Sequence, residues 1–242
     1  MRIYETCREM HSEEKRNLHE MGTKVHPQTM QDKEVSHDPK FETLELAPAV
    51  FTILSGKDRD EWLIELGCNL KWANQEFWER VRLTIDGDHG INPGQAWRER
   101  AEVWKPFLHN DQFSYTYSER FGRILGRRYG ALQKVCQELQ ARPDTRQAVL
   151  PVFCTPLDMP NMGGIARIPC SMHYQFMIRR HQLDLMYVMR SCDFVTHFPY
   201  DIWMALELQS AVATKLGYES GRFTFFAGSL HIYAKDADPG VF

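Results

Sequence analysis

The chain has 242 residues, of which 43% are hydrophobic and 25% charged, a composition typical of one globular domain with room for a sizeable core. Its 29 Lys and Arg against 32 Asp and Glu give a formal net charge of -3, which argues against nucleic acid or an anionic membrane as a general partner. The sequence contains no apolar run of transmembrane length, and its charged N-terminal segment is unlike a signal peptide. We therefore predict a single domain over residues 1–242.

The first half of the chain has mainly helical patterns. Apolar side chains recur at helical spacing in the first segment, which stops at Gly22, and Gly67 divides a longer stretch rich in helix formers. Pro143 ends the last helical run of this half. The predicted elements, in chain order, are a helix over residues 2–21, a strand over 41–46, two helices within 58–83, an exposed loop over 86–95, and helical segments over 96–108 and 120–144.

The second half is dominated by short runs of β-branched and aromatic residues, several of them alternating as strands do. One long helical segment lies among them, with Pro199 before it and Gly217 after it. The predicted elements are strands over residues 146–154, 173–179, 183–190 and 222–234, and a helix over residues 201–217. Early helices followed by strands around one helix predict an α/β (α+β) fold.

Several short motifs follow one another in the second half of the chain. They are Pro169-Cys170, Gln175-Phe176, Arg190-Ser191-Cys192-Asp193, Pro199-Tyr200-Asp201-Ile202 and His231-Ile232-Tyr233, with weaker upstream echoes in Tyr115-Thr116-Tyr117 and Pro143-Asp144-Thr145-Arg146. In order and spacing they resemble the thymidylate synthase family, whose signature is Pro-Cys, then Gln-Phe, Arg-Ser-x-Asp, Pro-Phe-Asn-Ile and His-x-Tyr. Residues 1–50 match that family poorly.

The resemblance implies the thymidylate synthase fold, in which a large twisted mixed β-sheet packs against helices and forms the interface of a homodimer. It also implies a nucleoside monophosphate as substrate and 5,10-methylenetetrahydrofolate as co-substrate, with no metal. Neither nucleic acid nor a membrane is expected as a partner. The expected location is the cytoplasm, that of a host cell if the chain is phage-encoded.

Cys170 carries the chemistry that this resemblance implies. The six cysteines are scattered without a C-x-x-C spacing, which indicates reduced thiols, and a strand cysteine is most often just a small buried residue. Within the motif, a thiolate at this position would add to C6 of a pyrimidine, make C5 nucleophilic toward a one-carbon unit, and leave again at the end. Its pKa would have to be lowered by a nearby cation, for which Arg190 is the candidate.

Two arginines are candidate ligands of the nucleotide 5′-phosphate, because a guanidinium binds an anion through paired hydrogen bonds, although a lone arginine is more often a solvated charge. The resemblance maps this role onto Arg190 in the chain that carries the cysteine and onto Arg146 from the partner chain. The phosphate site would then be shared across the dimer. The family's second partner arginine is Gln147 here, and its N-terminal arginine loop is replaced by residues 24–28.

Asp201 is the most informative departure from the family, which has Asn there. As a plain structural residue, an Asp after a Pro would be the N-cap of the following helix. As a binding residue it changes hydrogen-bond polarity, because an Asn amide matches O4 and N3-H of uracil, whereas a carboxylate accepts from the N4 amino group of cytosine and can share a proton with N3. The resemblance agrees, since family members that act on cytidylates carry Asp at this place.

The resemblance assigns further substrate contacts. His231 and Tyr233 alternate along a predicted strand, so both side chains face one side, where they would hold the sugar hydroxyl. Gln175 and Ser191, from the Gln-Phe and Arg-Ser motifs, are the other expected substrate-binding residues. A His and a Tyr in a strand are also common as structural residues at the edge of a core, where their polar atoms are hydrogen-bonded.

The remaining expected roles concern the folate and the proton transfers. Asp193 would contact the folate ring, and Trp78 would shield the reactive exocyclic methylene, although core packing explains Trp78 equally well. Tyr117 is a candidate for positioning water or accepting the C5 proton. A catalytic glutamate is expected on an early helix, where Glu61 is preferred to Glu65, although an exposed helix Glu is usually only a solvated charge.

The expected reaction is transfer of a one-carbon unit to C5 of a cytidine monophosphate, with water giving a 5-hydroxymethyl product and hydride a 5-methyl product. The resemblance favours water, because family members specific for cytidylates are mostly hydroxymethylases. Two polar changes are suited to ordering a water molecule: Ser171 in place of the family's His after the cysteine, and the replacement of the family's Gly near His197. Only residues 234–242 follow the His-x-Tyr motif, so the family's C-terminal lid is expected to be absent and the site less sealed. Methylation of dCMP, use of ribo-CMP, a dUMP-using synthase with an atypical Asp, and a non-catalytic nucleotide-binding or RNA-binding relative remain alternatives.

Overall fold

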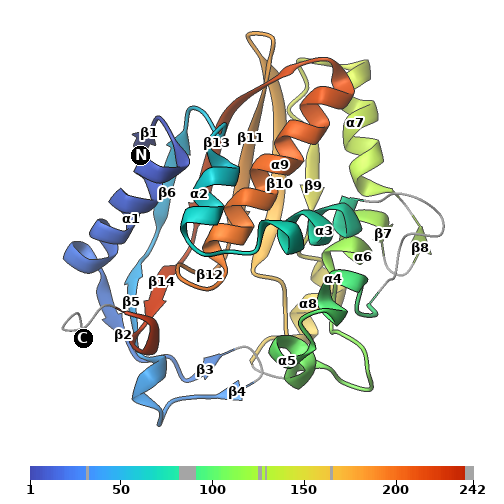
Figure 1. Cartoon of the computed structure of the whole chain (residues 1–242). Coiled ribbons are helices and arrows are strands. Elements are labelled where there is room, and N and C mark those ends of the chain that lie inside the picture. The colour runs from blue at the N-terminus through green and yellow to red at the C-terminus, as the bar shows by residue number, and fades with distance from the viewer. Residues whose placement is uncertain (31–32, 82–90, 125–126, 129, 164–165, 238–242) are drawn as a thin grey trace.

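The computed structural model describes the chain except residues 31–32, 82–90, 125–126, 129, 164–165 and 238–242 (Figure 1). The helices are α1 (Cys7–Met21), α2 (Arg59–Glu65), α3 (Leu70–Val81), α4 (Gln95–Arg98), α5 (Ala101–Trp104), α6 (Tyr117–Gly122), α7 (Ala131–Ala141), α8 (Thr155–Asp158) and α9 (Phe198–Leu216). The strands are β1 (Arg2–Tyr4), β2 (Thr23–Val25), β3 (Thr29–Met30), β4 (Lys33–Glu34), β5 (Thr43–Leu46), β6 (Ala49–Ile53), β7 (Arg123–Ile124), β8 (Arg127–Arg128), β9 (Val149–Pro151), β10 (Ser171–Arg179), β11 (Gln182–Met189), β12 (Cys192–Asp193), β13 (Glu219–Ala227) and β14 (Leu230–Tyr233).

A large mixed sheet confirms the predicted α/β fold class. Among the described residues it has six strands in the order β1-β6-β13-β11-β10-β9. The β1–β6 and β11–β13 pairs are parallel, whereas the β6–β13, β10–β11 and β9–β10 pairs are antiparallel. A second described sheet, β12-β14-β5-β2, joins it because β14 follows β13 after a short turn at Gly228, where a side chain would clash with the carbonyl of Arg190.

The core lies between the large sheet and α9, which crosses in front of the sheet in Figure 1. Apolar residues cover most of the surface of α9, as expected for a central helix, and its Gly217 C-cap adopts a left-handed conformation with φ +77°. The Gln209 side-chain amide donates to the carbonyl of Leu183 at 2.7 Å and to that of Arg222 at 3.1 Å, which ties α9 to the irregular start of the β11–β13 pair. Strands β11 and β13 are thereby held from the helix side.

The opposite face of the large sheet carries half-exposed side chains. Along β11, Leu183, Leu185 and Tyr187 are buried toward the helices, while Met186 and Val188 between them are only partly covered. On β13, Phe226 is 37% exposed on the same outer face. A monomer therefore presents an apolar strip on this side of the sheet.

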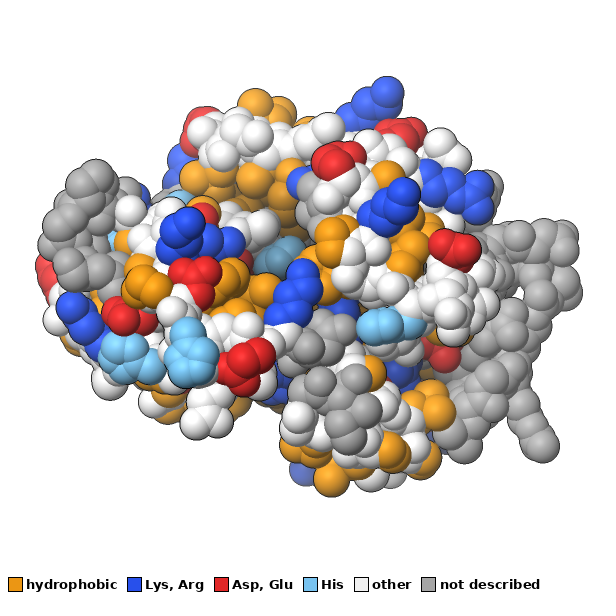
Figure 2. Space-filling model, turned by 90° about the horizontal axis from the view of Figure 1, so that it is seen from below, with side chains coloured by type: hydrophobic (Ala, Val, Ile, Leu, Met, Phe, Trp, Pro, Cys, Tyr) orange, Lys and Arg blue, Asp and Glu red, His pale blue; other side chains and the backbone are white. Residues whose placement is uncertain are grey.

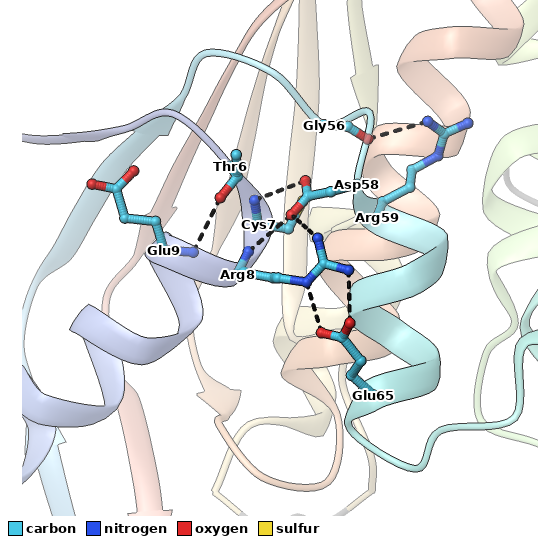
Figure 3. Close-up of polar contacts among 8 residues, drawn as sticks. All are labelled: Thr6, Cys7, Arg8, Glu9, Gly56, Asp58, Arg59 and Glu65. Atoms are coloured by element: carbon cyan, nitrogen blue, oxygen red, sulfur yellow. Dashed lines mark hydrogen bonds and ion pairs between the residues drawn. The ribbon is translucent and has the colours of Figure 1, made fainter.

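Helix α1 is attached to α2 through Asp58, which directly precedes α2 (Figure 3). The Asp58 carboxylate accepts hydrogen bonds from the backbone N–H groups of Cys7 and Arg8, at 3.0 and 3.1 Å. These are two of the otherwise unpaired donors at the first turn of α1, so this contact stabilises the helix by about 1 kcal/mol. Arg8 adds two hydrogen bonds to Glu65, an exposed pair that contributes less.

Three predicted elements need correction. The helix predicted over residues 2–21 begins at Cys7, because its first residues form β1 beside β6. The segment 120–144 is divided into α6, the β7–β8 pair and α7, and Gly130, at φ +60°, precedes α7. The single strand predicted over 222–234 becomes β13 and β14 in different sheets.

Other predicted elements agree with the structure or fall outside it. Gly67, at φ +72°, separates α2 from α3 as predicted, and the helix over 201–217 corresponds to α9. Residues 86–90 of the predicted loop and residues 238–242 of the expected short C-terminus lie outside the described residues. No helix in the described part of the chain is long and apolar enough to cross a membrane.

Candidate active site

The site is centred on Cys170 and Arg190, which the β10–β11 pair brings together. Cys170 directly precedes β10 and Arg190 directly follows β11, so the antiparallel pairing places both at the same end of the sheet. The backbone N–H of Arg190 donates to the carbonyl of Cys170 at 2.8 Å. Figure 2 views the molecule from this end and shows basic, histidine and apolar side chains around a recess.

The Arg190 guanidinium faces the Cys170 thiol. Its Nη2 lies 3.7 Å from Cys170 Sγ, and Nε donates to the carbonyl of Pro169 at 3.0 Å, which fixes the orientation of the side chain. A cation next to a half-buried cysteine favours the thiolate, the nucleophilic form. This geometry supplies the cation that the sequence predicted for Cys170.

Three phenol and alcohol groups form a chain beside the thiol. Ser171, the residue after Cys170, is fully buried, and its Oγ lies 2.7 Å from the hydroxyl of Tyr117. The same Oγ is also hydrogen-bonded to the hydroxyl of Tyr187. Burial raises the pKa of Tyr117 and of Tyr187 well above the ordinary value, so all three groups are neutral hydroxyls near neutral pH.

Asp201 lies in the first turn of α9, next to Cys192. It is not the N-cap of the helix, as its position after Pro199 had led us to consider, because α9 begins at Phe198 and its N-cap is His197. Instead the Cys192 thiol donates to Asp201 Oδ2 at 3.8 Å. Burial raises the pKa of the Asp201 carboxyl, which makes a protonated acid more accessible there than on a surface.

His231 and Tyr233 share one side of β14, as predicted. Their rings contact edge to face with centroids 5.0 Å apart, and Ile232 between them is buried on the other side. Burial lowers the pKa of His231, so its imidazole is neutral near pH 7, with Nδ1 3.2 Å from Ser229 Oγ. Burial and the neighbouring charges of Asp193 and Cys170 raise the pKa of Tyr233 to about 12, which places this pair within the electrostatic reach of the nucleophile.

Asp193 lies on β12, which pairs with β14 beside His231. Its Oδ1 accepts from the backbone N–H groups of Val195 and Thr196, at 3.0 and 3.1 Å, and these bonds hold the turn that leads into α9. Among the described residues, Oδ2 has no hydrogen bond to the protein. Ser191, the residue between Arg190 and β12, is partly buried.

Arg146 and Gln175 lie apart from Cys170 within one chain. The Gln175 side-chain amide donates to the backbone carbonyl of Arg146 at 3.0 Å. Because Gln175 alternates with the buried Tyr174 and Phe176, it points to the outer face of the sheet, and Arg146 is exposed at the same edge. Within one chain the structure thus shows Gln175 supporting the Arg146 backbone, and the substrate contact expected for it stays a prediction.

Glu61 and Trp78 are the two predicted site residues that the structure leaves on the surface. Glu61 is exposed on α2, where its charge acts on Arg8 of α1. Trp78 is 56% exposed on α3 and packs against Phe77 with ring centroids 5.2 Å apart. The buried sides of α2 and α3 turn other residues toward the sheet, and the roles expected for Glu61 and Trp78 stay predictions.

The buried side of α3 carries an ion pair that the sequence analysis missed. Arg80 Nε donates to Glu76 Oε1 at 2.7 Å, with side chains only 10% and 5% exposed, and the guanidinium carbon of Arg80 lies 4.0 Å from the centre of the Tyr117 ring. Burial opposes the charge on Arg80, but Glu76, Tyr117 and Tyr174 together outweigh burial and raise the pKa of Arg80. The i,i+4 spacing of Glu76 and Arg80 beside Ala73 and Phe77 is the signal that would have shown a buried pair.

The chain matches the thymidylate synthase family over residues 44–239. It is 30% identical over 148 residues to a Methanosarcina barkeri protein named "Putative thymidylate synthase". The aligned residues cover 59% of this chain and 66% of that protein. It is 26% identical over 160 residues to a Bacillus licheniformis thymidylate synthase, 64% of this chain and 53% of the relative. A bifunctional dihydrofolate reductase-thymidylate synthase from Paramecium tetraurelia is 24% identical over 189 residues, 76% of this chain and 37% of the relative. The chain thus spans at most two thirds of the length of these relatives.

The raised pKa of Asp201 predicts a pH-dependent stability difference between the chain and its Asp201→Asn variant. Below the ordinary Asp pKa of about 3.9 the acid is neutral in both folded and unfolded chains, so its ionisation costs nothing. As the pH rises through the higher folded-state pKa, the folded chain must hold a buried carboxylate, and stability is lost. We expect the melting temperature of Asp201→Asn, relative to the unmodified chain, to increase from pH 4 to pH 8. A difference that stays constant over this range would contradict the assignment.

Proposed function

The chain belongs to the thymidylate synthase family, whose members are one-carbon-transferring enzymes, and we propose that it transfers a hydroxymethyl group to C5 of deoxycytidine monophosphate. The observation that carries this proposal is the half-buried carboxyl of Asp201, with its raised pKa, near the Cys170–Arg190 pair. We propose cytidylate rather than uridylate as the substrate because of that carboxyl. Deoxyribose is favoured because the relatives are named for thymidylate, a deoxynucleotide.

Asp201 suits cytosine through the polarity of its hydrogen bonds. With one proton shared between the Asp201 carboxyl and N3, the two carboxyl oxygens pair with N3 and with the N4 amino group of cytosine. Uracil presents N3-H and O4 in the opposite order, so an ionised Asp201 would set a carboxylate oxygen against O4. Burial of Asp201 supports the protonated form, and the Cys192 thiol holds the carboxyl from behind.

Cys170 is the proposed nucleophile. Its thiolate, stabilised by Arg190, adds to C6 and makes C5 nucleophilic. 5,10-Methylenetetrahydrofolate supplies the one-carbon unit that C5 takes up. C5 then loses its proton while the bond between the new methylene and the folate nitrogen breaks, so tetrahydrofolate leaves and an exocyclic methylene forms. Water adds to that methylene, and the C6–S bond breaks, which returns the Cys170 thiolate and the aromatic ring.

The residues around Asp193 fit a folate ring. Asp193 Oδ1 is occupied by two backbone N–H groups, which leaves Oδ2 to accept hydrogen bonds from the ring nitrogens of a pterin. Val195, two residues on, is 43% exposed and offers apolar contact beside that carboxylate. We propose that Asp193 holds the folate, as the sequence analysis expected.

Water is the proposed second nucleophile because the surroundings of Cys170 are polar. Ser171 and Tyr117 place hydroxyl groups next to the cysteine, in a position where an apolar wall would exclude water. His197 precedes α9 on the surface, and its charge acts on both Asp201 and His231. These groups are suited to hold a water molecule near the exocyclic methylene.

Glu76 replaces Glu61 in our proposal for the catalytic glutamate. It is 4% exposed, bonded to Arg80, and linked through Arg80 to the ring of Tyr117, whereas Glu61 lies on the surface. We propose that Glu76 serves proton transfer at the pyrimidine and that a water molecule hydrogen-bonded to the neutral Tyr117 hydroxyl takes the C5 proton. The positive charge of Arg80 also favours the carboxylate form of Asp201, in opposition to burial.

The phosphate site is proposed to form across a homodimer. Arg190 is the ligand from the same chain, whereas Arg146 is exposed on the outer face of the sheet and does not reach Cys170 in its own chain. The half-exposed Met186, Val188 and Phe226 on that face are suited to pack against a second copy. Such a dimer would carry Arg146 into the partner's site.

The substrate and the product are tested together by tritium release from C5-labelled dCMP, CMP and dUMP, with and without methylenetetrahydrofolate. We expect folate-dependent release that is fastest from dCMP and absent in Cys170→Ser, because the thiolate alone activates C5. The product mass should show the gain of CH2O. A gain of CH2 would identify a methyltransferase, preference for CMP or dUMP would identify the other substrates, and release undiminished in Cys170→Ser would exclude this nucleophile.

The Asp201→Asn variant tests the specificity argument. An Asn amide restores the donor and acceptor pattern that suits uracil, so we expect the ratio of kcat/KM for dCMP over dUMP to fall by about 100-fold or more. Asp193→Asn is the matched control, since it changes the same chemical group at the proposed folate contact and should leave the nucleotide ratio unchanged. An unaltered ratio in Asp201→Asn would contradict the role given to this carboxyl.

A mixed dimer tests whether the phosphate site is shared. We expect Cys170→Ser and Arg146→Ala each to have low activity alone, and a mixture of the two, refolded together, to regain activity. Hybrid dimers would contain one site with both an intact cysteine and an intact partner arginine. In the control mixture, Arg179→Ala replaces Arg146→Ala, because Arg179 lies on the outer face of β10 together with Gln175. Absence of recovery, or a monomeric chain in sedimentation, would contradict the shared site.

A further inference from the structure

We propose that Ser171 and Tyr187 are positioning residues that hold the Tyr117 hydroxyl in place for removal of the C5 proton, an inference that rests on the proposed function. Ser171 directly follows the nucleophile Cys170, and its Oγ contacts the hydroxyls of both tyrosines. The chain of three hydroxyls therefore links Tyr117 to the buried Tyr187 of the core through Ser171.

Tyr187 provides that fixed point. It is fully buried on β11, stacked on Tyr174 of β10 with ring centroids 4.3 Å apart and planes 6° apart, and these two residues are direct partners in the strand register. The ring of Phe225 contacts it edge to face at 5.8 Å. Packing on both sides leaves the Tyr187 ring no alternative position, so its hydroxyl has one location relative to β10.

Ser171 transmits this position to Tyr117. A serine hydroxyl has one proton and two acceptor lone pairs, so Ser171 Oγ can hydrogen-bond to both phenol hydroxyls at once and fix the distance between them. Arg80 lies against the face of the Tyr117 ring at 4.0 Å. The ring of Tyr117 is thus held by Arg80 and its oxygen by Ser171, whose backbone is continuous with Cys170.

The position of Tyr117 matters in one step of the reaction. When Cys170 is bonded to C6, the neighbouring C5 carries both the new one-carbon unit and the proton to be removed. The C5–H bond breaks, its proton passes to a water molecule hydrogen-bonded to Tyr117, and its electron pair forms the exocyclic double bond as the folate amine leaves. A displaced Tyr117 hydroxyl would slow this step without affecting the earlier addition of Cys170.

The test separates these two steps in Tyr187→Phe and Ser171→Ala. Covalent attachment of 5-fluoro-dCMP to Cys170, measured by intact mass in the presence of methylenetetrahydrofolate, reports addition and one-carbon uptake but not proton loss, because fluorine occupies the place of the proton. Tritium release from C5-labelled dCMP reports proton loss. We expect attachment rates within about 2-fold of the unmodified chain, kcat for tritium release lower by about 10-fold to 100-fold, and a nearly unchanged KM.

Two controls distinguish positioning from folding. Ser171→Thr keeps the hydroxyl and should recover most of the rate lost in Ser171→Ala. Tyr4→Phe removes another buried phenol hydroxyl, bonded to Glu14 at 2.6 Å near α1, and should leave tritium release unchanged even if stability falls. Unchanged release in Tyr187→Phe and Ser171→Ala, or an equal loss of attachment and release, would overturn the positioning role alone. Failure of the unmodified chain to release tritium from any nucleotide would overturn the proposed function with it.

Discussion

The hydrogen bond from the Arg190 N–H to the Cys170 carbonyl is the contact on which the site depends. It extends the β10–β11 pairing by one step beyond the strands, so the register that buries Tyr174 against Tyr187 also determines where the thiol and the guanidinium meet. A shift of one residue between these strands would turn every buried side chain of β10 outward. The same core packing that stabilises the sheet therefore holds the nucleophile next to its cation.

Two opposite electrostatic environments lie within this one site. Cys170 is partly exposed and faces a cation, which favours the negative thiolate. Burial raises the pKa of Asp201 and outweighs the charges of His197 and Arg80 and the hydrogen bond from the Cys192 thiol, which all favour the carboxylate. The surroundings of the two groups thus act in opposite directions, since a neighbouring cation favours the charged form of Cys170 while burial disfavours the charged form of Asp201.

The sequence predicted the parts of the site that depend on local motifs, and failed where the outcome depends on how elements pack. Cys170, Arg190, His231 and Tyr233 lie at or beside strand ends, and their spacing along the chain already determines which residues can meet. Glu61 was chosen from a helix without knowledge of which side of α2 faces the sheet, and the structure shows that side to be occupied by Trp62 and Leu63. Conversely, Glu76 and Arg80 read as ordinary helix charges until α3 is seen to pack against α6 and α9.

Gln175 shows why strand alternation matters for function as well as for packing. Gln175 lies five residues after Cys170, and in a regular strand this odd spacing would put the two side chains on opposite faces of the sheet. The irregularity between Ser171 and His173 interrupts that alternation, so spacing alone does not determine the face of Gln175. The structure resolves the relation: Ser171 and Tyr174 face the helices, whereas Gln175 faces outward and holds the backbone of Arg146. One strand thereby serves two purposes, because its inner face positions the hydroxyl chain beside the nucleophile and its outer face presents an arginine to whatever covers the sheet. If a second copy covers it, each chain would contribute Arg146, which lies apart from Cys170 of its own chain, to the phosphate site proposed for its partner.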